Sequence, residues 1–283
     1  MKNQAQKNNF LPTFAAAIAI LFISCSTTDY GKYELIERDI PITGTIKGII
    51  IEGPWEVTVT QNDNDNSAFI QYNAPDNKIK AELRPNGILH LKLYNRSSKR
   101  NIKLTATINA AELKTIDGSG AAIIYTYENF TTSADINLSG ASLLCGFYCE
   151  GDKEVINLSG SSIMKKCTFI GKRIDATLSG GSNVTYSNIE VDKCKVDVSG
   201  SSIFTGSGYA EETDFNGSGG STFFTFELES ENLDIDLSGS SEGEVNVLHK
   251  IKGTLSGSSI LKYKKAEDVS DVTLTGGSKI IKE

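Results

Sequence analysis

Histidine, tryptophan and proline are scarce in this chain of 283 residues, which contains two His, one Trp and five Pro. So few imidazole and indole side chains disfavour a His-rich metal site and a dense aromatic binding platform. Disorder or collagen would bring more proline, and a chain with 39% hydrophobic residues is too apolar for wholesale disorder. Clustered Lys and Arg are also lacking, and the net charge is -7, so we expect no nucleic-acid partner.

A short apolar run near the N-terminus covers residues 14–23. Lys2 and Lys7 precede it, and no acidic residue occurs up to residue 24. A basic start followed by so short a run is typical of a secretory signal and not of a spanning helix. We therefore predict that residues 1–24 are a signal peptide.

The run ends at Cys25, which follows the small residue Ser24. This ending resembles a bacterial lipoprotein signal, in which that cysteine carries the lipids, although Phe22 departs from the usual Leu; ordinary cleavage near Ser24 is the alternative. With lipids on Cys25, residues 25–34 form a tether, and the exported protein is anchored to the outer membrane, on its periplasmic face or at the cell surface. Removal of residues 1–24 leaves 26 basic and 35 acidic residues, and anionic headgroups repel such an acidic protein. The acyl chains, and not a basic patch, must therefore attach the protein to the membrane.

A phrase close to Leu-Ser-Gly-Ser-Ser recurs nine times after residue 116, at intervals of 18 to 20 residues. Such self-similarity marks a repeat architecture. A glycine follows the first hydroxyl residue of every copy, which predicts a bend in each repeat, because glycine takes positive φ without strain. We number the positions of each repeat from this hydroxyl residue, which is position zero. The nine position zero residues are Ser119, Ser139, Ser159, Ser179, Ser199, Ser218, Ser238, Ser256 and Thr275.

The residues around each bend alternate between apolar and polar. Positions minus five, minus three and minus one tend to be apolar, and position plus five is apolar in eight of the nine copies. A period of two indicates strands, and the gaps between bends are too short for a strand plus a capped helix. The Leu pattern of a leucine-rich repeat is also missing. The sequence therefore predicts an all-β fold, a parallel β-solenoid with one coil of about 20 residues per repeat over residues 111–283.

Residues 35–110 have longer alternating runs instead of the repeat. Turn signals at residues 62–66 and 84–87 suit antiparallel hairpins. Solenoids need covered ends, so we predict that this segment is an N-terminal β-cap with hairpins. Residues 51–55 also echo residues 116–120, which predicts a first, degenerate coil within the cap.

An opening strand around residues 46–51, then hairpins, then serial Leu-Ser-Gly-Ser-Ser together resemble the auto-transporter adhesin family of head GIN domains. This family is common among secreted and lipid-anchored proteins of Bacteroides-like bacteria. The resemblance covers residues 45–280 and rests on the texture of the repeats. It implies a right-handed β-helix and a cell-envelope location, but no established activity and no functional residues.

Two motifs suggest chemistry but fit it poorly. Residues 239–243 match the nucleophile-elbow pattern Gly-x-Ser-x-Gly, with His249 nearby, yet Ser241 occupies a corner column that serines fill in other repeats. Asp63 and Asp65 begin a calcium-loop spacing that lacks the required Gly and Glu. We therefore predict no catalytic residue, no cofactor and no metal site.

Four cysteines follow Cys25. Cys149, Cys167 and Cys194 occupy repeat positions that mostly hold apolar residues in the other repeats, whereas Cys145 does not. This pattern predicts that the three cysteines are small side chains of the core. The export route is oxidising, so a disulfide between Cys149 and Cys167 in adjacent coils stays open as an alternative.

The outward polar positions supply a candidate binding surface. Stacked coils would place carboxylates from position minus four beside carboxylates and amides from position minus two, forming a flat acidic and amide-rich face for cations, glycans or a protein. A solvated strand face that only keeps the rod soluble is the alternative. The candidate residues are Asp135, Asp175, Asp214 and Asp234 at minus four, and Asn137, Asn157, Asp197 and Asp236 at minus two.

The leading hypothesis is a non-enzymatic, lipid-anchored envelope protein that presents an adhesin-like surface to a glycan, a matrix component or a neighbouring protein. A β-helical polysaccharide-degrading enzyme is a second hypothesis. Repeats of 18 to 20 residues, however, leave no room for the inserted loops that carry such catalytic groups. A structural protein that assembles through open coil ends is the third.

Overall fold

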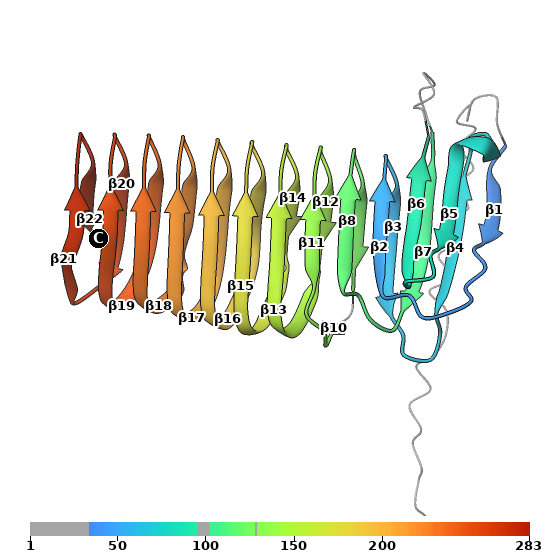
Figure 1. Ribbon diagram of the computed structural model, residues 1–283, viewed down its shortest axis with the longest axis horizontal. Coiled ribbons are helices and arrows are strands. Elements are labelled where there is room, and N and C mark those ends of the chain that lie inside the picture. The colour runs from blue at the N-terminus through green and yellow to red at the C-terminus, as the bar shows by residue number, and fades with distance from the viewer. Residues whose placement is uncertain (1–33, 95–101, 128) are drawn as a thin grey trace, which may run out of the picture.

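The described residues form an elongated stack of β-coils capped at its N-terminal end (Figure 1). The computed structural model describes residues 34–94, 102–127 and 129–283. The predicted signal peptide, Cys25 and the tether up to residue 33 lie outside the described residues. Within the described ranges, no helix is long and apolar enough to cross a membrane.

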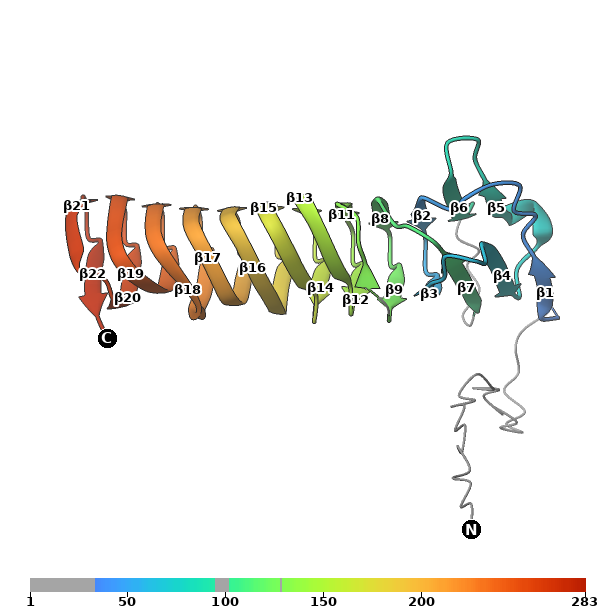
Figure 2. The same cartoon turned by 90° about the horizontal axis from the view of Figure 1, so that it is seen from below.

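The coil stack is the C-terminal part of the chain, in which coils follow one another in sequence order (Figure 2). Its ladders are parallel, and Ile136 pairs with Ile116 on one side and with Ile156 on the other. One repeat therefore makes one coil, which confirms the predicted β-solenoid. The strands are β8 (Thr115–Ser119), β9 (Ile123–Thr126), β10 (Asn129–Phe130), β11 (Asp135–Leu138), β12 (Leu143–Cys145), β13 (Tyr148–Leu158), β14 (Ile163–Lys165), β15 (Thr168–Leu178), β16 (Asn183–Val198), β17 (Ile203–Gly217), β18 (Thr222–Leu237), β19 (Glu242–Leu255), β20 (Ile260–Lys265), β21 (Asp268–Leu274) and β22 (Lys279–Lys282).

Each corner of the stack bends at the predicted glycine. The glycine after position zero has a φ between 68° and 78° in all nine copies. The glycines also stack closely, because a Cβ added to Gly180 would lie 2.7 Å from the carbonyl oxygen of Gly160. An L side chain would therefore meet both backbone strain and a clash at this position.

A column of buried serines, three residues after position zero, completes the corners. From Ser142 to Ser259 these serines are at most 1% exposed. Their hydroxyls bond to the corner backbone, as when Ser162 Oγ donates to the carbonyl oxygen of Ser159 at 2.9 Å. The corner thus satisfies its buried polar groups locally.

The inside of the stack is filled by one continuous cluster of buried side chains. Inward positions alternate with outward ones along each strand, as the period of two predicts. Buried aromatic side chains contribute to this core, and the rings of Phe215 and Phe223 stack with centroids 5.0 Å apart.

The N-terminal region has a different order in space from its order in the chain. Strand β2 pairs in parallel with both β6 and β8, and β3 pairs in parallel with both β7 and β9, so the β2–β3 coil lies between β6–β7 and the stack. Antiparallel strands β5, β4 and β1 then cover the end. The elements are β1 (Ile36–Asp39), β2 (Gly48–Glu52), β3 (Glu56–Gln61), β4 (Ser67–Tyr72), the 3-10 turn η1 (Asp76–Lys78), β5 (Ile79–Leu83), β6 (Ile88–Leu93) and β7 (Leu104–Ala110).

Two details of the cap differ from the prediction. The hairpin over residues 84–87 is present, because β5 and β6 pair antiparallel, but residues 62–66 do not close a hairpin. Both edges of β3 are occupied by the parallel strands β7 and β9, so β4 pairs on the far side of β7. The degenerate coil is also present, but Ile51 pairs with Gly118 and not with Ile116, two residues from the register that the sequence echo suggests.

Candidate functional site

The predicted surface residues lie on one outward face of the coil stack. Asp135 and Asn137 of β11 are exposed, whereas Ile136 and Leu138 are buried between and beside them. The parallel register continues these two positions from coil to coil through β13, β15, β16, β17 and β18. The structure therefore brings all eight candidate residues onto the same face, and their role in binding stays a prediction.

The position minus four column, here called the charged column, combines its carboxylates with lysines, and several of its carboxylates form ion pairs. Asp175 lies 2.6 Å from Arg173 Nη2 and 3.1 Å from Lys153 Nζ. Partial burial acts to raise the pKa of Asp175, but these hydrogen bonds outweigh it and hold the pKa below its usual value. Further along, ion pairs of 3.2 and 3.1 Å join Lys195 to Asp214 and Lys252 to Asp234.

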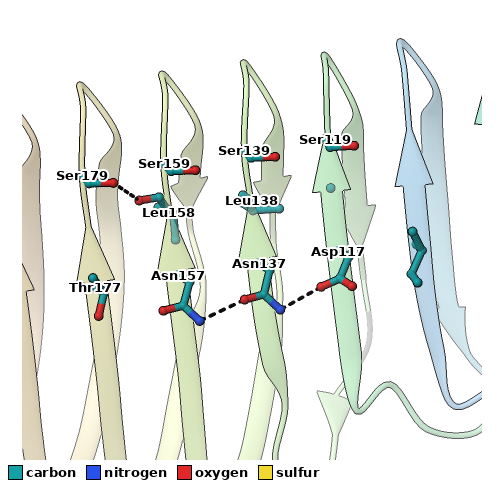
Figure 3. Close-up of a pocket in the computed structure, with 12 residues that line it drawn as sticks. Asp117, Ser119, Asn137, Leu138, Ser139, Asn157, Leu158, Ser159, Thr177 and Ser179 are labelled. Carbon is teal, nitrogen blue, oxygen red and sulfur yellow. Dashed lines mark hydrogen bonds between the residues drawn. The ribbon is translucent and has the colours of Figure 1, made fainter.

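The position minus two column, here called the amide column, contains an ordered hydrogen-bond ladder in two segments, the first of which is drawn in Figure 3. Asn137 Nδ2 donates to Asp117 Oδ1 at 2.8 Å, and Asn157 Nδ2 donates to Asn137 Oδ1 at 2.9 Å. Asn216 Nδ2 donates to Asp197 Oδ1 in the same way, at 2.8 Å. Asn137 and Asn157 each use one of their two N–H groups in the ladder, so the other N–H group remains for a ligand. Asn216 Nδ2 also donates to Asp214 Oδ1 at 3.0 Å and has no such free group.

The position zero serines form a hydroxyl column beside the amide column (Figure 3). Ser179 Oγ donates to the carbonyl oxygen of Leu158 at a long 3.5 Å. In the described part of the chain, the hydroxyls of Ser119, Ser139 and Ser159 have no hydrogen-bond partner. They are therefore free to donate to and accept from a ligand.

A shallow groove runs between the amide and hydroxyl columns, and we call it the corner groove. Its first part, of about 430 Å³, is lined from Ile50 to Ser179, and its second part, of about 300 Å³, from Thr177 to Ser238. Both parts are lined by Thr177, so the groove continues along the stack. The sequence reasoning missed Asp117, Thr177 and the serine hydroxyls as lining residues, although all of them occupy the repeating columns.

A second hollow, of about 370 Å³, lies on the other side of the charged column. Its walls mix both signs of charge, and Lys193 pairs with Glu212 at 3.2 Å. Lys250 and Lys252 also line it. The two hollows thus differ in chemistry: the corner groove combines neutral amides and hydroxyls with a few carboxylates and no cation, whereas the second hollow contains charges of both signs.

The motifs that suggested catalysis have other roles in the structure. Ser241 is 1% exposed and donates to the carbonyl oxygen of Ser238 at 2.7 Å, so its hydroxyl serves the corner. His249 is exposed and lies 3.5 Å from Glu267. Asp65 accepts a hydrogen bond from Ser67 in the connection between β3 and β4.

The four cysteines of the described residues are free thiols, so the alternative disulfide is absent. Cys149, Cys167 and Cys194 are buried in the core as predicted, and burial raises the pKa of the last two to about 12. Cys149 Sγ lies 2.8 Å from the carbonyl oxygen of Thr132 and donates to it.

Glu154 is the one exception among the described residues to an interior of neutral side chains. It points inward in a column that holds Ala134 and Ile174 in the adjacent coils, and it is fully buried. Burial raises its pKa to about 7. Cys149 Sγ lies 3.4 Å from Oε1, and Oε2 has no partner among the described residues.

The model of a family described as "Putative auto-transporter adhesin, head GIN domain" matches residues 46–266. Three solved structures have a similar fold at low sequence identity, and none of the curated proteins matches the chain. A "putative adhesin" from Parabacteroides distasonis is 19% identical with a TM-score of 0.62, over 89% of this chain and 96% of that chain. A "putative adhesin" from Parabacteroides merdae is 15% identical with a TM-score of 0.64, over 89% and 98%. A "putative lipid binding protein" from Parabacteroides distasonis is 16% identical with a TM-score of 0.62, over 88% and 96%.

Proposed function

This chain belongs to the auto-transporter adhesin, head GIN domain family, and we propose that it is a non-enzymatic envelope protein that binds a surface ligand through its solenoid. The observation that carries the proposal is the corner groove, with its ordered amides and unpaired hydroxyls. Side chains already held by a ladder lose little conformational freedom when a ligand binds. Because the inside of the coils is filled by the core, the ligand binds on the outside.

The proposal includes a lipid anchor on Cys25 and a position at the outer membrane. The ending Ser24-Cys25 after an apolar run supports this, together with the family. Strand β1, the first strand of the described residues, pairs with β4 at the capped end, and the coil stack extends away from that end (Figure 2). The polar face is thereby held clear of the membrane.

The anchor is tested by replacing Cys25 with Ala and fractionating the cells that produce the protein. We expect the wild-type chain in the membrane fraction and the variant in the soluble fraction of the envelope, because a polar, acidic chain has no other membrane anchor in the proposal. Membrane association of the variant at the wild-type level would contradict the anchor.

The binding role is tested with purified protein on beads, which are exposed to panels of glycans, matrix proteins and envelope fragments. Saturable binding to at least one class of ligand supports the proposal. Absence of binding to all three classes contradicts it and favours a structural role.

A further inference from the structure

We propose that the corner groove binds a linear, uncharged polysaccharide, which lies along the axis of the coil stack. This inference rests on the proposed function and names its ligand class. Three properties of the groove carry it: its length, its donors and acceptors, and its charge.

The groove is long in the direction of the stack. Its lining residues come from or adjoin β2, β8, β11, β13, β15, β16, β17 and β18, which pair in that order along the axis. At about 4.8 Å per strand, the groove is roughly 34 Å long. Such a shape accommodates an extended polymer better than a compact ligand.

In its first part, the groove offers the same neutral groups in two successive coils. Asn137 and Asn157 each present a free N–H group, and Ser139 and Ser159 present hydroxyls that both donate and accept. A repeating chain of sugar units carries hydroxyl groups of the same dual character. An extended peptide would instead require an open strand edge or side-chain pockets, whereas the strands at the groove have coils paired on both sides.

The charge of the groove disfavours an acidic polymer. Asp117 is the one charged residue that lines its first part, and Asp197 and Asp236 add charge of the same sign in the second part. No Lys or Arg occurs among these lining residues. A polyanion would therefore give up the strong hydration of its charges and face carboxylates of the same sign without a cation in the groove to offset them, whereas an uncharged chain carries no charge to be repelled.

The first experiment compares ligands by calorimetry with the purified full chain. The probes are linear β-1,4-mannan, β-1,4-xylan and β-1,3-glucan against alginate and polygalacturonate of similar length. We expect at least one neutral polymer to bind at least about tenfold more tightly than either acidic one. Absence of binding to all three neutral polymers, or a preference for an acidic polymer, would overturn the inference.

The second experiment locates the binding. The double variant Asn137→Ala and Asn157→Ala removes two ladder amides, and we expect about tenfold weaker binding of the best neutral polymer. The matched control is Thr185→Ala with Thr205→Ala, at half-buried outward positions beyond the corner, and it should bind like the wild type. Equal affinity of the two double variants would overturn the inference.

A further double variant distinguishes a loss of binding from a loss of folding. Ser139→Ala with Ser159→Ala removes two hydroxyls that have no partner in the described structure, so it leaves the ladder intact. We expect it to unfold at the wild-type temperature and to bind about threefold to tenfold more weakly. Wild-type affinity of this variant would remove the serines from the site and contradict the inference.

A length series tests the extended binding mode. Affinity for oligosaccharides of the best polymer should rise with length until the ligand spans the groove, roughly 34 Å, and then level off. A plateau already at two or three sugar units would contradict binding along the axis. If the protein binds only matrix proteins or envelope fragments, this inference fails while the proposed function stands.

Discussion

The coil stack and the N-terminal region solve the same packing problem in different ways. In the stack, Ile136 lies between Ile116 and Ile156, so spatial neighbours are one repeat apart in the chain. In the N-terminal region, Ile49 lies between Leu89 and Ile116, and the chain must fold back before β2 has both neighbours. The sequence repeats of the stack therefore form the columns that line the groove. The non-sequential strand order of the N-terminal region covers the end of the stack.

The two regions also differ in how they hold polar groups. The stack repeats neutral serine hydroxyls and glycines at each corner. The N-terminal region instead surrounds a buried side chain with charged groups: His90 lies 2.6 Å from Arg84 Nη2 and 2.7 Å from Glu52 Oε1, and Lys92 lies 2.7 Å from Glu52 Oε2. The ion pairs of the stack, by contrast, lie on its outward face. The predictions below use glycine replacement and pH to separate the two regions.

The largest effect is expected for Gly180→Ala in the stack. Gly180 has a φ of 78°, and the new Cβ would lie 2.7 Å from the carbonyl oxygen of Gly160. Backbone strain and the clash together should lower the free energy of unfolding by about 2–5 kcal/mol, measured by urea unfolding. The adjacent Gly181→Ala is the matched control, because its Cβ would approach an atom no closer than 3.9 Å; its effect should stay within about 0.5 kcal/mol.

The same change in the N-terminal region should cost less. Gly53 has a φ of 110°, but a Cβ there would approach Leu93 Cβ at 3.3 Å and no backbone oxygen as closely as at Gly180. We expect Gly53→Ala to lower the free energy of unfolding by about 1–2 kcal/mol. A loss as large as that of Gly180→Ala would show that the corners of both regions are equally tight.

The next effect concerns Glu154 and the pH dependence of the stack. Its pKa of about 7 in the fold exceeds the ordinary 4.5, so between these pH values the unfolded chain loses the proton first. Stability should therefore be greatest below about pH 4.5 and decrease by about 3 kcal/mol as the pH rises through 7. Glu154→Gln should abolish this decrease in urea unfolding at several pH values, whereas Glu150→Gln, at an exposed position on the same strand, should retain it.

The smallest effect is expected at His90 and has the opposite sign. Burial lowers the pKa of His90 below 6.5, with Arg84 adding to this and Glu52 opposing it. On acidification the unfolded chain therefore takes up the proton first. The contribution of neutral His90 to the stability of this region should be complete above pH 6.5 and decrease as the pH falls below it. Hydrogen-exchange protection factors of β5 and β6 should fall between pH 7 and pH 5. His90→Gln should remove the fall, and an unchanged fall in this variant would contradict the role of His90.

The repeat register predicted most of the stack from the sequence. The glycine after position zero indicated each bend, and alternation around it placed residues such as Asn137 and Asn157 on one outward face. The groove residues belong to the same repeating columns. Glu154 is also visible in the sequence, because it is an acidic residue in a column that is otherwise mostly apolar. These could be found by reading every member of each column, since a column fixes which way a side chain points.

The interleaved cap and the ion pairs could not be obtained in this way. The placement of β7 between β3 and β4 depends on pairings between segments far apart in the chain. The turn signal at residues 62–66 is local and does not indicate these pairings. The neutralisation of Asp175 depends on how Arg173 and Lys153 orient their long side chains. Periodicity specifies columns but not these side-chain geometries.

The most direct test of the binding surface follows the side-chain amide signals of asparagines by nuclear magnetic resonance while the best neutral polysaccharide is added. Asn137 and Asn157 line the corner groove, whereas Asn188 lies in a part of β16 that does not line it. The account predicts that the side-chain signals of Asn137 and Asn157 shift in a saturable manner and that the signal of Asn188 does not move. Shifts at Asn188 with unchanged signals from Asn137 and Asn157 would contradict it.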